Sequence, residues 1–291
     1  MGLKAKVKRA TRYVLSNMGR PVHVEIGIRR ADEVLDGRTV LVTGGTTGIG
    51  YAIAEAVVRA GGSVVVTSRS AGRGEGVCGK LRELKGPGQI FSGELDLSNV
   101  DDMIQQYQRI RDGIVPLKID ALVNNAGILN VSNFGRVDES EWDSVMDTNL
   151  KGSFFLSQEV ARDLMSTKTK GNIVFITSSS AYRPATNPYS CSKWALRGLV
   201  LGLSKMLAPH DIIVNAVAPG PTATPLLFEG AADNYSRPNS PIGRYVTPEE
   251  IASMVVTLLG DESRSIVGDT IRMTGGSGVV TFDDVTSDFD C

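Results

Sequence analysis

The sequence predicts an α/β protein whose parallel sheet is covered by helices on both faces. Short, continuously apolar segments recur along the chain, and most are followed by a segment with helical periodicity. Strands of this kind are buried on both sides, as in sheets flanked by two helical layers. Since no linker or shift in composition divides residues 37–278, we expect one domain there, with a basic extension at 1–36 and an acidic tail at 279–291.

The expected strands are the runs rich in valine, isoleucine and leucine, and the expected helices are the longer amphipathic stretches between them. Strands are expected at 38–43, 63–68, 89–95, 119–124, 172–177, 212–217 and 270–273. Helices are expected at 48–60, 74–84, 99–112, 140–165, 188–208 and 248–259. Gly61-Gly62 ends the first helix, and Thr247-Pro248-Glu249-Glu250 matches a capping box that begins the last one.

Composition excludes several classes of function. The chain has 291 residues, a formal net charge of -1 and a hydrophobic fraction of 42%, which argues against nucleic acid as the main partner. Cys78, Cys191 and Cys291 lack the spacing of metal ligands, so we expect no metal site and a reducing, cytoplasmic location. No apolar run is long enough to cross a bilayer.

The first 30 residues are strongly basic, with Glu25 as their single acid. Apolar residues recur there at helical spacing, at Leu3, Val7, Ala10, Val14 and Met18. The pattern indicates a short amphipathic helix that docks on its own domain or on a sister subunit, or contacts an anionic membrane surface; a frayed tail is the remaining alternative. Docking is favoured, because one short helix anchors poorly on a membrane by itself.

A glycine-rich stretch, Thr43 to Gly50, follows the first strand and opens the first helix. Glycines at 44, 48 and 50 allow a tight turn and let the backbone approach a pyrophosphate at the helix N-terminus. The spacing is G-x-x-x-G-x-G rather than G-x-G-x-x-G, but the position between strand and helix predicts a dinucleotide site.

The end of the second strand indicates which dinucleotide is bound. A carboxylate there holds the ribose 2′-hydroxyl of NAD, whereas an arginine accommodates the 2′-phosphate of NADP. The chain reads Val66-Thr67-Ser68-Arg69-Ser70, with no acid. Ser68 and Arg69 therefore favour NADP(H), with NAD(H) as the alternative.

Tyr189 and Lys193 lie four residues apart, on one face of the helix expected at 188–208. A free tyrosine keeps its proton until about pH 10. A positive charge nearby favours the phenolate, so we expect the Lys193 ammonium to lower the pKa of Tyr189. Beside a bound dinucleotide, such a pair indicates hydride-transfer chemistry with proton exchange.

These motifs, taken in order, resemble those of the short-chain dehydrogenase/reductase family over about residues 37–278. They are the glycine stretch, Asn124-Asn125-Ala126-Gly127, Asn149, the serines 178–180, Tyr189-x-x-x-Lys193 and Pro219-Gly220. The resemblance implies a Rossmann-type three-layer αβα sandwich with seven parallel strands in the order 3-2-1-4-5-6-7. It also implies a nicotinamide dinucleotide and a homo-oligomer, either a dimer or a homotetramer.

The resemblance also implies residue roles. Tyr189 would exchange a proton with the substrate oxygen, Lys193 would bind the nicotinamide ribose, Ser178 would orient the substrate, and Asn149 would hold a water that links Lys193 to solvent. The cofactor would be lined by Gly44, Thr46, Thr47, Gly48, Ile49, Gly50, Ser68, Arg69, Asp96, Leu97, Asn125, Ala126, Gly127, Pro219, Gly220 and Thr222. The loop from Ser178 to Tyr189 is shorter than the family often has, so Ser179 or Ser180 stays an alternative for the functional hydroxyl.

The implied activity is NAD(P)(H)-dependent hydride transfer to or from a carbonyl or secondary alcohol of a small molecule. The alternative is a dinucleotide-binding regulator or scaffold without turnover, which would lack one of the four catalytic residues. Residues 221–245, rich in proline, glycine and asparagine, are expected to form a lid over the substrate.

Overall fold

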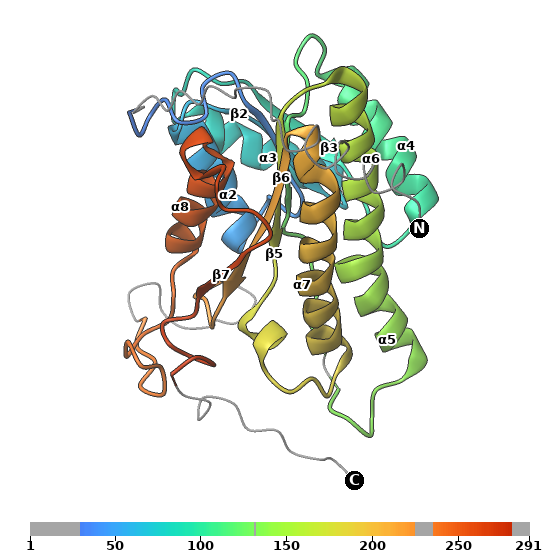
Figure 1. The fold of residues 1–291 in the computed structure, drawn as a ribbon, viewed down its shortest axis with the longest axis vertical. Coiled ribbons are helices and arrows are strands. Elements are labelled where there is room, and N and C mark those ends of the chain that lie inside the picture. The colour runs from blue at the N-terminus through green and yellow to red at the C-terminus, as the bar shows by residue number, and fades with distance from the viewer. Residues whose placement is uncertain (1–29, 131, 225–234, 281–291) are drawn as a thin grey trace, which may run out of the picture.

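The computed structural model describes residues 30–130, 132–224 and 235–280, which fold around one sheet (Figure 1). All seven strands are parallel, in the order β3-β2-β1-β4-β5-β6-β7, as the sequence predicts. The strands are β1 Thr39–Val42, β2 Ser63–Ser68, β3 Ile90–Glu94, β4 Ala121–Asn124, β5 Gly171–Ile176, β6 Ile212–Pro219 and β7 Thr270–Met273. Strand order reverses between β1 and β4, which is where ligands bind in open α/β sheets.

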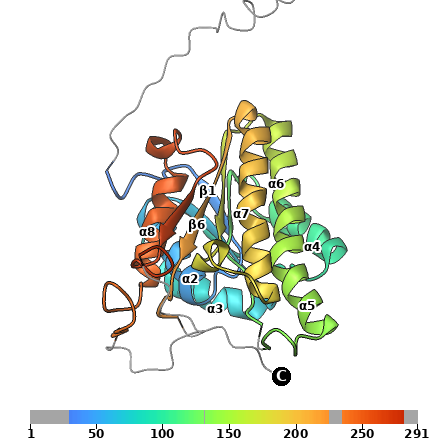
Figure 2. The same cartoon turned by 60° about the horizontal axis from the view of Figure 1, so that its bottom comes forward.

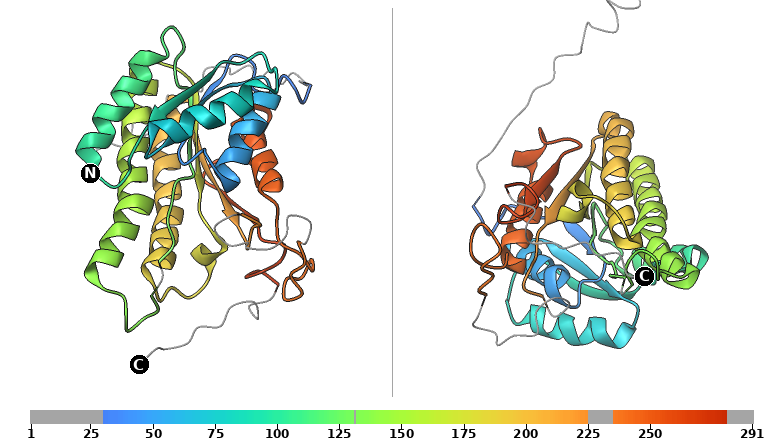
Figure 3. Two further views of the ribbon diagram at one scale, coloured as in Figure 1. Left: turned by 180° about the vertical axis from the view of Figure 1, so that it is seen from behind. Right: turned by 90° about the horizontal axis from the view of Figure 1, so that it is seen from below.

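Helices cover both faces of the sheet, with α2, α3 and α8 on one side and α4, α6 and α7 on the other (Figures 1 and 3). The helices are α2 Gly48–Arg59, α3 Ala71–Arg82, α4 Val100–Gly113, α5 Glu139–Met146, α6 Ser153–Thr167, α7 Pro188–Leu207 and α8 Pro248–Leu259. Four short helical segments complete the described fold: η1 Asp147–Gly152, η2 Ser179–Tyr182, η3 Ala208–His210 and η4 Asp261–Ser263.

Alternate strand residues supply the two hydrophobic cores. In β1, Val40 and Val42 pack under α2 and α8, while Leu41 packs on the opposite core under α4, α6 and α7. Each of these side chains is fully buried, because successive residues of a strand point to opposite faces. Continuous apolar strands are therefore required in this fold.

The region from 140 to 165, expected to be a helix, is not one regular α-helix. α5 and α6 are joined by η1, a π-helical turn of six residues. Such turns occur often at functional sites, and this one carries Asn149, which is 1% exposed.

Side chains cap two helices that lead to the candidate site. The Asn187 side chain accepts a hydrogen bond from the Ser190 backbone N–H at 2.8 Å, and Pro188 opens α7. Thr247 and Glu250 form the predicted capping box at the start of α8. The start of α7, where Tyr189 lies, is therefore fixed by local sequence.

The packed domain begins before residue 37. Leu35 is fully buried in the core, and its N–H donates to the Ala60 carbonyl at 2.8 Å. The helix expected at the N-terminus, most of the acidic tail and the middle of the expected lid lie outside the described residues. Within the described ranges, no helix is long and apolar enough to cross a membrane, and no three His, Cys, Asp or Glu residues gather where a metal ion would fit.

Candidate active site

One cavity of about 630 Å³ opens at the carboxyl ends of the strands. The loops that follow the strands gather at the lower edge in Figure 1, which Figure 2 and the right-hand view of Figure 3 turn toward the viewer. Every residue expected at the site, apart from Asn149, lines this cavity.

The glycine turn between β1 and α2 forms one end of the cavity. Gly44 and Gly48 adopt φ values of +62° and +54°, which other residues rarely tolerate. A Cβ at Gly50 would collide with the Gly44 carbonyl and the Asn125 amide. Thr47, the N-cap of α2, makes no side-chain cap, so the first N–H groups of the helix are not satisfied by it. This cradle has the shape and polarity that a pyrophosphate needs.

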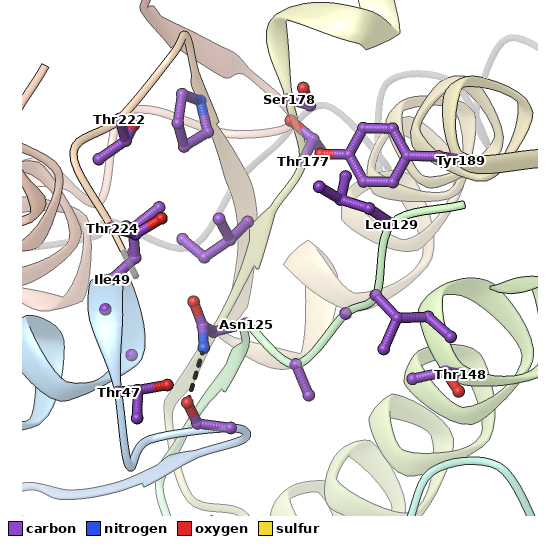
Figure 4. Close-up of a pocket in the computed structure, with 18 of the residues that line it drawn as sticks. Thr47, Ile49, Asn125, Leu129, Thr148, Thr177, Ser178, Tyr189, Thr222 and Thr224 are labelled. Carbon is purple, nitrogen blue, oxygen red and sulfur yellow. Dashed lines mark hydrogen bonds between the residues drawn. The ribbon is translucent and has the colours of Figure 1, made fainter. Parts of the chain in front are cut away.

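Asn125 fastens the glycine turn to the end of β4 (Figure 4). Its side-chain N–H groups donate to the carbonyls of Thr43 and Gly44 at 2.9 and 3.2 Å. The Thr43 hydroxyl in turn accepts from the backbone N–H groups of Asn125 and Ala126, both at 3.0 Å. The two strands at the switch point are therefore held in one arrangement.

The far side of the glycine turn is cationic. Ser68, Arg69 and Ser70 line the cavity at the end of β2, and Arg73 joins them from the first turn of α3. Sequence reasoning missed Arg73, although its spacing of four residues from Arg69 was a usable signal. Asp96 lies nearby after β3, and its carboxylate accepts hydrogen bonds from the Ser98 N–H and hydroxyl at 3.0 and 2.8 Å.

Tyr189 and Ser178 face each other at the opposite end of the cavity (Figure 4). Burial raises the pKa of Tyr189, and a hydrogen bond with the Ser178 side chain acts in the opposite direction. Ser178 also accepts a hydrogen bond from the Ser180 backbone N–H at 3.1 Å. Ser179 and Ser180 line the cavity too.

Lys193 is buried one turn after Tyr189. Its ammonium donates to the Ile176 carbonyl at 3.0 Å and lies 5.5 Å from the centre of the Tyr189 ring. Burial lowers the pKa of Lys193 to about 8. The structure thus brings the pair together as expected, but it does not show the lowered pKa of Tyr189 that the sequence predicted. Removal from water raises the pKa of the phenol, and Lys193 is not among the causes that shift it.

Asn149 holds the loop after β4 with both ends of its amide. Its Nδ2 donates to the Ile128 carbonyl at 2.9 Å, and its Oδ1 accepts from the Ile128 N–H at 2.8 Å. A Cβ on Gly127 would lie 3.2 Å from this Oδ1 and 3.6 Å from the Lys193 ammonium, so both groups flank Gly127. Ser192, which sequence reasoning missed, accepts from Asn149 Nδ2 at 3.3 Å.

The segment after β6 closes the remaining side. Pro219, Gly220 and Thr222 line the cavity, and the Thr222 hydroxyl donates to the Gly220 carbonyl at 2.9 Å. Of the expected lid, the described residues that reach the cavity are Pro221, Thr222, Thr224, Arg237 and Tyr245. Of the apolar residues in this segment expected to cover the substrate, Leu226, Leu227 and Phe228 lie outside the described residues, and Tyr235 does not line the cavity.

Comparisons with known proteins agree with this geometry. A family model described as short chain dehydrogenase matches residues 38–234. The 3-oxoacyl-[acyl-carrier-protein] reductase of Aquifex aeolicus is 34% identical over 250 residues, which cover 83% of this chain and 98% of the relative.

Solved structures show the same fold. A short-chain type dehydrogenase/reductase from Mycobacterium marinum superimposes with a TM-score of 0.77 at 30% identity, covering 84% of this chain and 97% of that one. A 3-oxoacyl-[acyl-carrier protein] reductase from Brucella melitensis with bound NAD gives 0.74 at 28% identity, covering 87% and 98%.

Proposed function

The chain belongs to the short-chain dehydrogenase/reductase family, whose members use NAD(P)(H), and on that premise we propose the specific reaction. The protein transfers a hydride between a nicotinamide cofactor, NADP(H) in preference to NAD(H), and the carbonyl or secondary alcohol of a small molecule. One observation carries the proposal: the glycine turn, Ser178, Tyr189 and Lys193 line a single cavity.

The cavity walls fit the dinucleotide. The glycine turn would hold the pyrophosphate, Asp96 and Leu97 the adenine, and Asn125 to Gly127 the ribose and ring. Pro219, Gly220 and Thr222 would border the nicotinamide end. The cofactor, when bound, supplies or receives the hydride.

Tyr189 acts as the proton donor during reduction. Its raised pKa keeps the phenol protonated at neutral pH, which is the state that a donor to a carbonyl oxygen requires. Ser178 lies against that phenol and donates a hydrogen bond to the oxygen as negative charge develops on it. This contact favours Ser178 over Ser179 and Ser180 as the functional hydroxyl.

Lys193 and Asn149 support cofactor binding and proton exchange at the site. The Lys193 ammonium binds the cofactor ribose and supplies positive charge near Tyr189, while Asn149 supports the water through which Lys193 exchanges protons with solvent. The buried amide of Asn149 and its closeness to Lys193 across Gly127 support this role.

Cofactor preference follows from the cationic end of the cavity. β2 ends at Ser68, and Arg69 and Arg73 line the cavity where a 2′-phosphate would lie. An acid would be needed to favour the 2′-hydroxyl of NAD.

Self-association is proposed through α5, α6 and α7. Trp142, Phe154, Trp194 and Leu201 on these helices are each at least 40% exposed. Aromatic side chains exposed to this degree favour a protein partner, and a dimer or tetramer would cover them. Light scattering coupled to gel filtration would measure the mass, and a monomer at micromolar concentration would contradict this proposal.

Replacing Tyr189 by phenylalanine tests the mechanism. We expect kcat/KM for carbonyl reduction to fall by about 10²–10⁴-fold, since a positioned acid contributes that much, while NADPH still binds. Tyr51→Phe, a phenol of α2 outside the cavity lining, is the matched control and should keep wild-type activity. A Tyr189→Phe enzyme with normal turnover would refute the assigned acid. If the wild type binds NADPH tightly but turns over no carbonyl, the alternative of a dinucleotide-binding regulator or scaffold without turnover would be favoured.

A further inference from the structure

The strand β3 forms one outer edge of the sheet within the described residues, and β2 pairs with its inner side. The Val64 N–H donates to the Gln89 carbonyl, and the Leu95 N–H donates to the Ser68 carbonyl, both at 2.9 Å. Backbone groups alternate in direction along a strand, so the odd-numbered residues from 89 to 95 bond to β2. The backbone groups of residues 90, 92 and 94 therefore point away from the sheet.

The outward backbone groups of β3 are only partly satisfied. Arg82 of α3 donates through Nη2 to the Ile90 carbonyl at 3.1 Å. Within the described ranges, the structure gives no hydrogen-bond partner to the N–H and carbonyl groups of Ser92 and Glu94. An edge strand with such groups is a template for one more strand.

The two faces of the sheet beside this edge differ in polarity. On the α3 face, the Ser92 hydroxyl donates to the Glu75 carboxylate, and Arg82 is exposed. On the α4 face there is a groove of about 310 Å³, to which Gln106 and Arg109 contribute polar groups. Its apolar lining is Phe91, Gly93, Ile110 and Ile114. A strand added here would therefore have one apolar and one polar face.

Residues 22–28 have this alternation. They read Val-His-Val-Glu-Ile-Gly-Ile, with a β-branched residue at every even position. A period of two over seven residues is typical of a strand with one buried face. The segment lies outside the described residues, and it ends two positions before Arg30, the first described residue.

The chain enters the domain beside the start of β3. Leu35 packs on the glycine turn after α2, since a Cβ on Gly62 would lie 3.1 Å from its side chain. The loop before β3 packs on the same turn, because a Cβ on Gly88 would collide with the Gly62 carbonyl. The position beyond β3 is three strands from β1, about 14 Å, and the position beyond β7 is five strands away, about 24 Å. The β3 edge is therefore the nearer one.

The point of entry fixes the direction of the added strand. Ile28 is followed closely by Arg30 and Leu35, which places it near the N-terminal end of β3. The segment therefore runs antiparallel to β3.

The polarity of the two faces fixes which residues pair. Residues directly opposite each other in an antiparallel pair point to the same face. The apolar even-numbered residues of the segment belong over the α4 groove, as do Phe91 and Gly93. The residues opposite Ser92 and Glu94 then come from the polar set His23, Glu25 and Gly27.

We propose that residues 22–28 of this chain form an eighth strand, antiparallel to β3 and bound to its outer edge. Val22, Val24, Ile26 and Ile28 cover the α4 groove, while the intervening residues make the backbone hydrogen bonds. Charge favours the same arrangement, because Glu25, the single acid of the first 30 residues, lies on the face of Arg82. The added strand covers an edge that would otherwise pair with other chains.

Amide hydrogen exchange, followed by NMR, tests the pairing. We expect the N–H groups of Ser92 and Glu94 to exchange at least about tenfold faster in a chain beginning at Ala31 than in the full chain. A chain beginning at Arg20 keeps the segment and should keep the slow exchange. The Leu95 N–H, which bonds to β2, is the internal control and should change by less than about threefold. Equal rates at Ser92 and Glu94 in all three chains, or fast exchange in the chain beginning at Arg20, would overturn the proposal.

Two proline variants of the full chain test the pairing further. Glu25→Pro removes an N–H that points to β3 and should raise the exchange rates of Ser92 and Glu94 to those of the chain beginning at Ala31. Val24→Pro is the matched control, because its N–H points away from the sheet, and the rates should stay within about threefold. Thermal unfolding and NADPH binding check that both variants fold. The reverse order, or equal losses in both, would refute the pairing.

Other occupants of the edge give different results. Protection of Ser92 and Glu94 that is lost on dilution of the full chain would assign the edge to a second copy. Protection that depends on the segment but appears at the Arg272 N–H of β7 would place the strand at the opposite edge. Either result would overturn the proposal.

Discussion

Replacing Lys193 by methionine should stabilise the cofactor-free protein near neutral pH while removing its activity. Methionine has similar length and no charge. The fall in the pKa of Lys193 from 10.5 to about 8 means that the buried ammonium costs about 3 kcal/mol of stability at pH 7, at about 1.4 kcal/mol per pKa unit. The variant also loses the hydrogen bond to the Ile176 carbonyl, which lowers its stability by about 1 kcal/mol. The net gain should be about 2 kcal/mol.

The pH dependence separates this electrostatic effect from packing. Between about pH 8 and 10.5 the unfolded chain holds the Lys193 proton and the native protein does not, so wild-type stability rises with pH across that window. The methionine variant lacks this dependence. The difference in the free energy of unfolding between the variant and the wild type should therefore shrink by about 2–3 kcal/mol between pH 7 and pH 10. Urea unfolding of both proteins at several pH values measures the difference. A variant that is less stable by the same amount at every pH would refute the reasoning.

Four further results are expected. Arg69→Asp should raise the ratio of kcat/KM for NADH over NADPH by at least about tenfold, and an unchanged ratio in steady-state kinetics would remove Arg69 as the selector. Gly50→Ala should weaken NADPH binding in a fluorescence titration, because the new methyl group would strike the Gly44 carbonyl; unchanged affinity would contradict the cradle. Asp120→Ala removes the nearer of the two carboxylates that pair with the buried Arg38 guanidinium, which keeps Asp261 at 3.7 Å, and should lower the free energy of unfolding by about 1.5–3 kcal/mol, with a loss under 1 kcal/mol in urea unfolding counting against it. A chain beginning at Ala31 should keep kcat, and a folded but inactive truncation would show that the extension helps to build the site.

The fold could be predicted from local sequence because every strand of this architecture must meet the same physical requirement. Each strand is buried on both faces and must be apolar, and the capping box at Thr247 marks the start of α8 without any knowledge of the tertiary structure. The π-helical turn η1 was not foreseen, since no residue type marks the extra backbone residue. Leu35 was assigned to the extension because nothing local shows that it packs against the end of α2.

The site was predicted only where a motif fixed it. Tyr189 and Lys193 share a helical face by their spacing, so their meeting could be foreseen. Their ionisation could not, because the sequence does not reveal that the ammonium is bound to the Ile176 carbonyl and withdrawn from water. Arg183 and Arg237, which also line the cavity, lie in loops whose paths depend on distant contacts, such as that between Arg183 and Gly278.

The wide turn η1 takes up one residue more than a regular α-helical turn would hold. Removing one residue from Asp147–Gly152 would let α5 and α6 continue as a single α-helix, and the faces of α6 would keep their directions because the extra residue is accommodated locally. The loss would fall on Asn149, whose amide binds both polar backbone groups of Ile128 from within this turn. A one-codon deletion here would thus leave the outer surface of α6 in place and release the loop after β4.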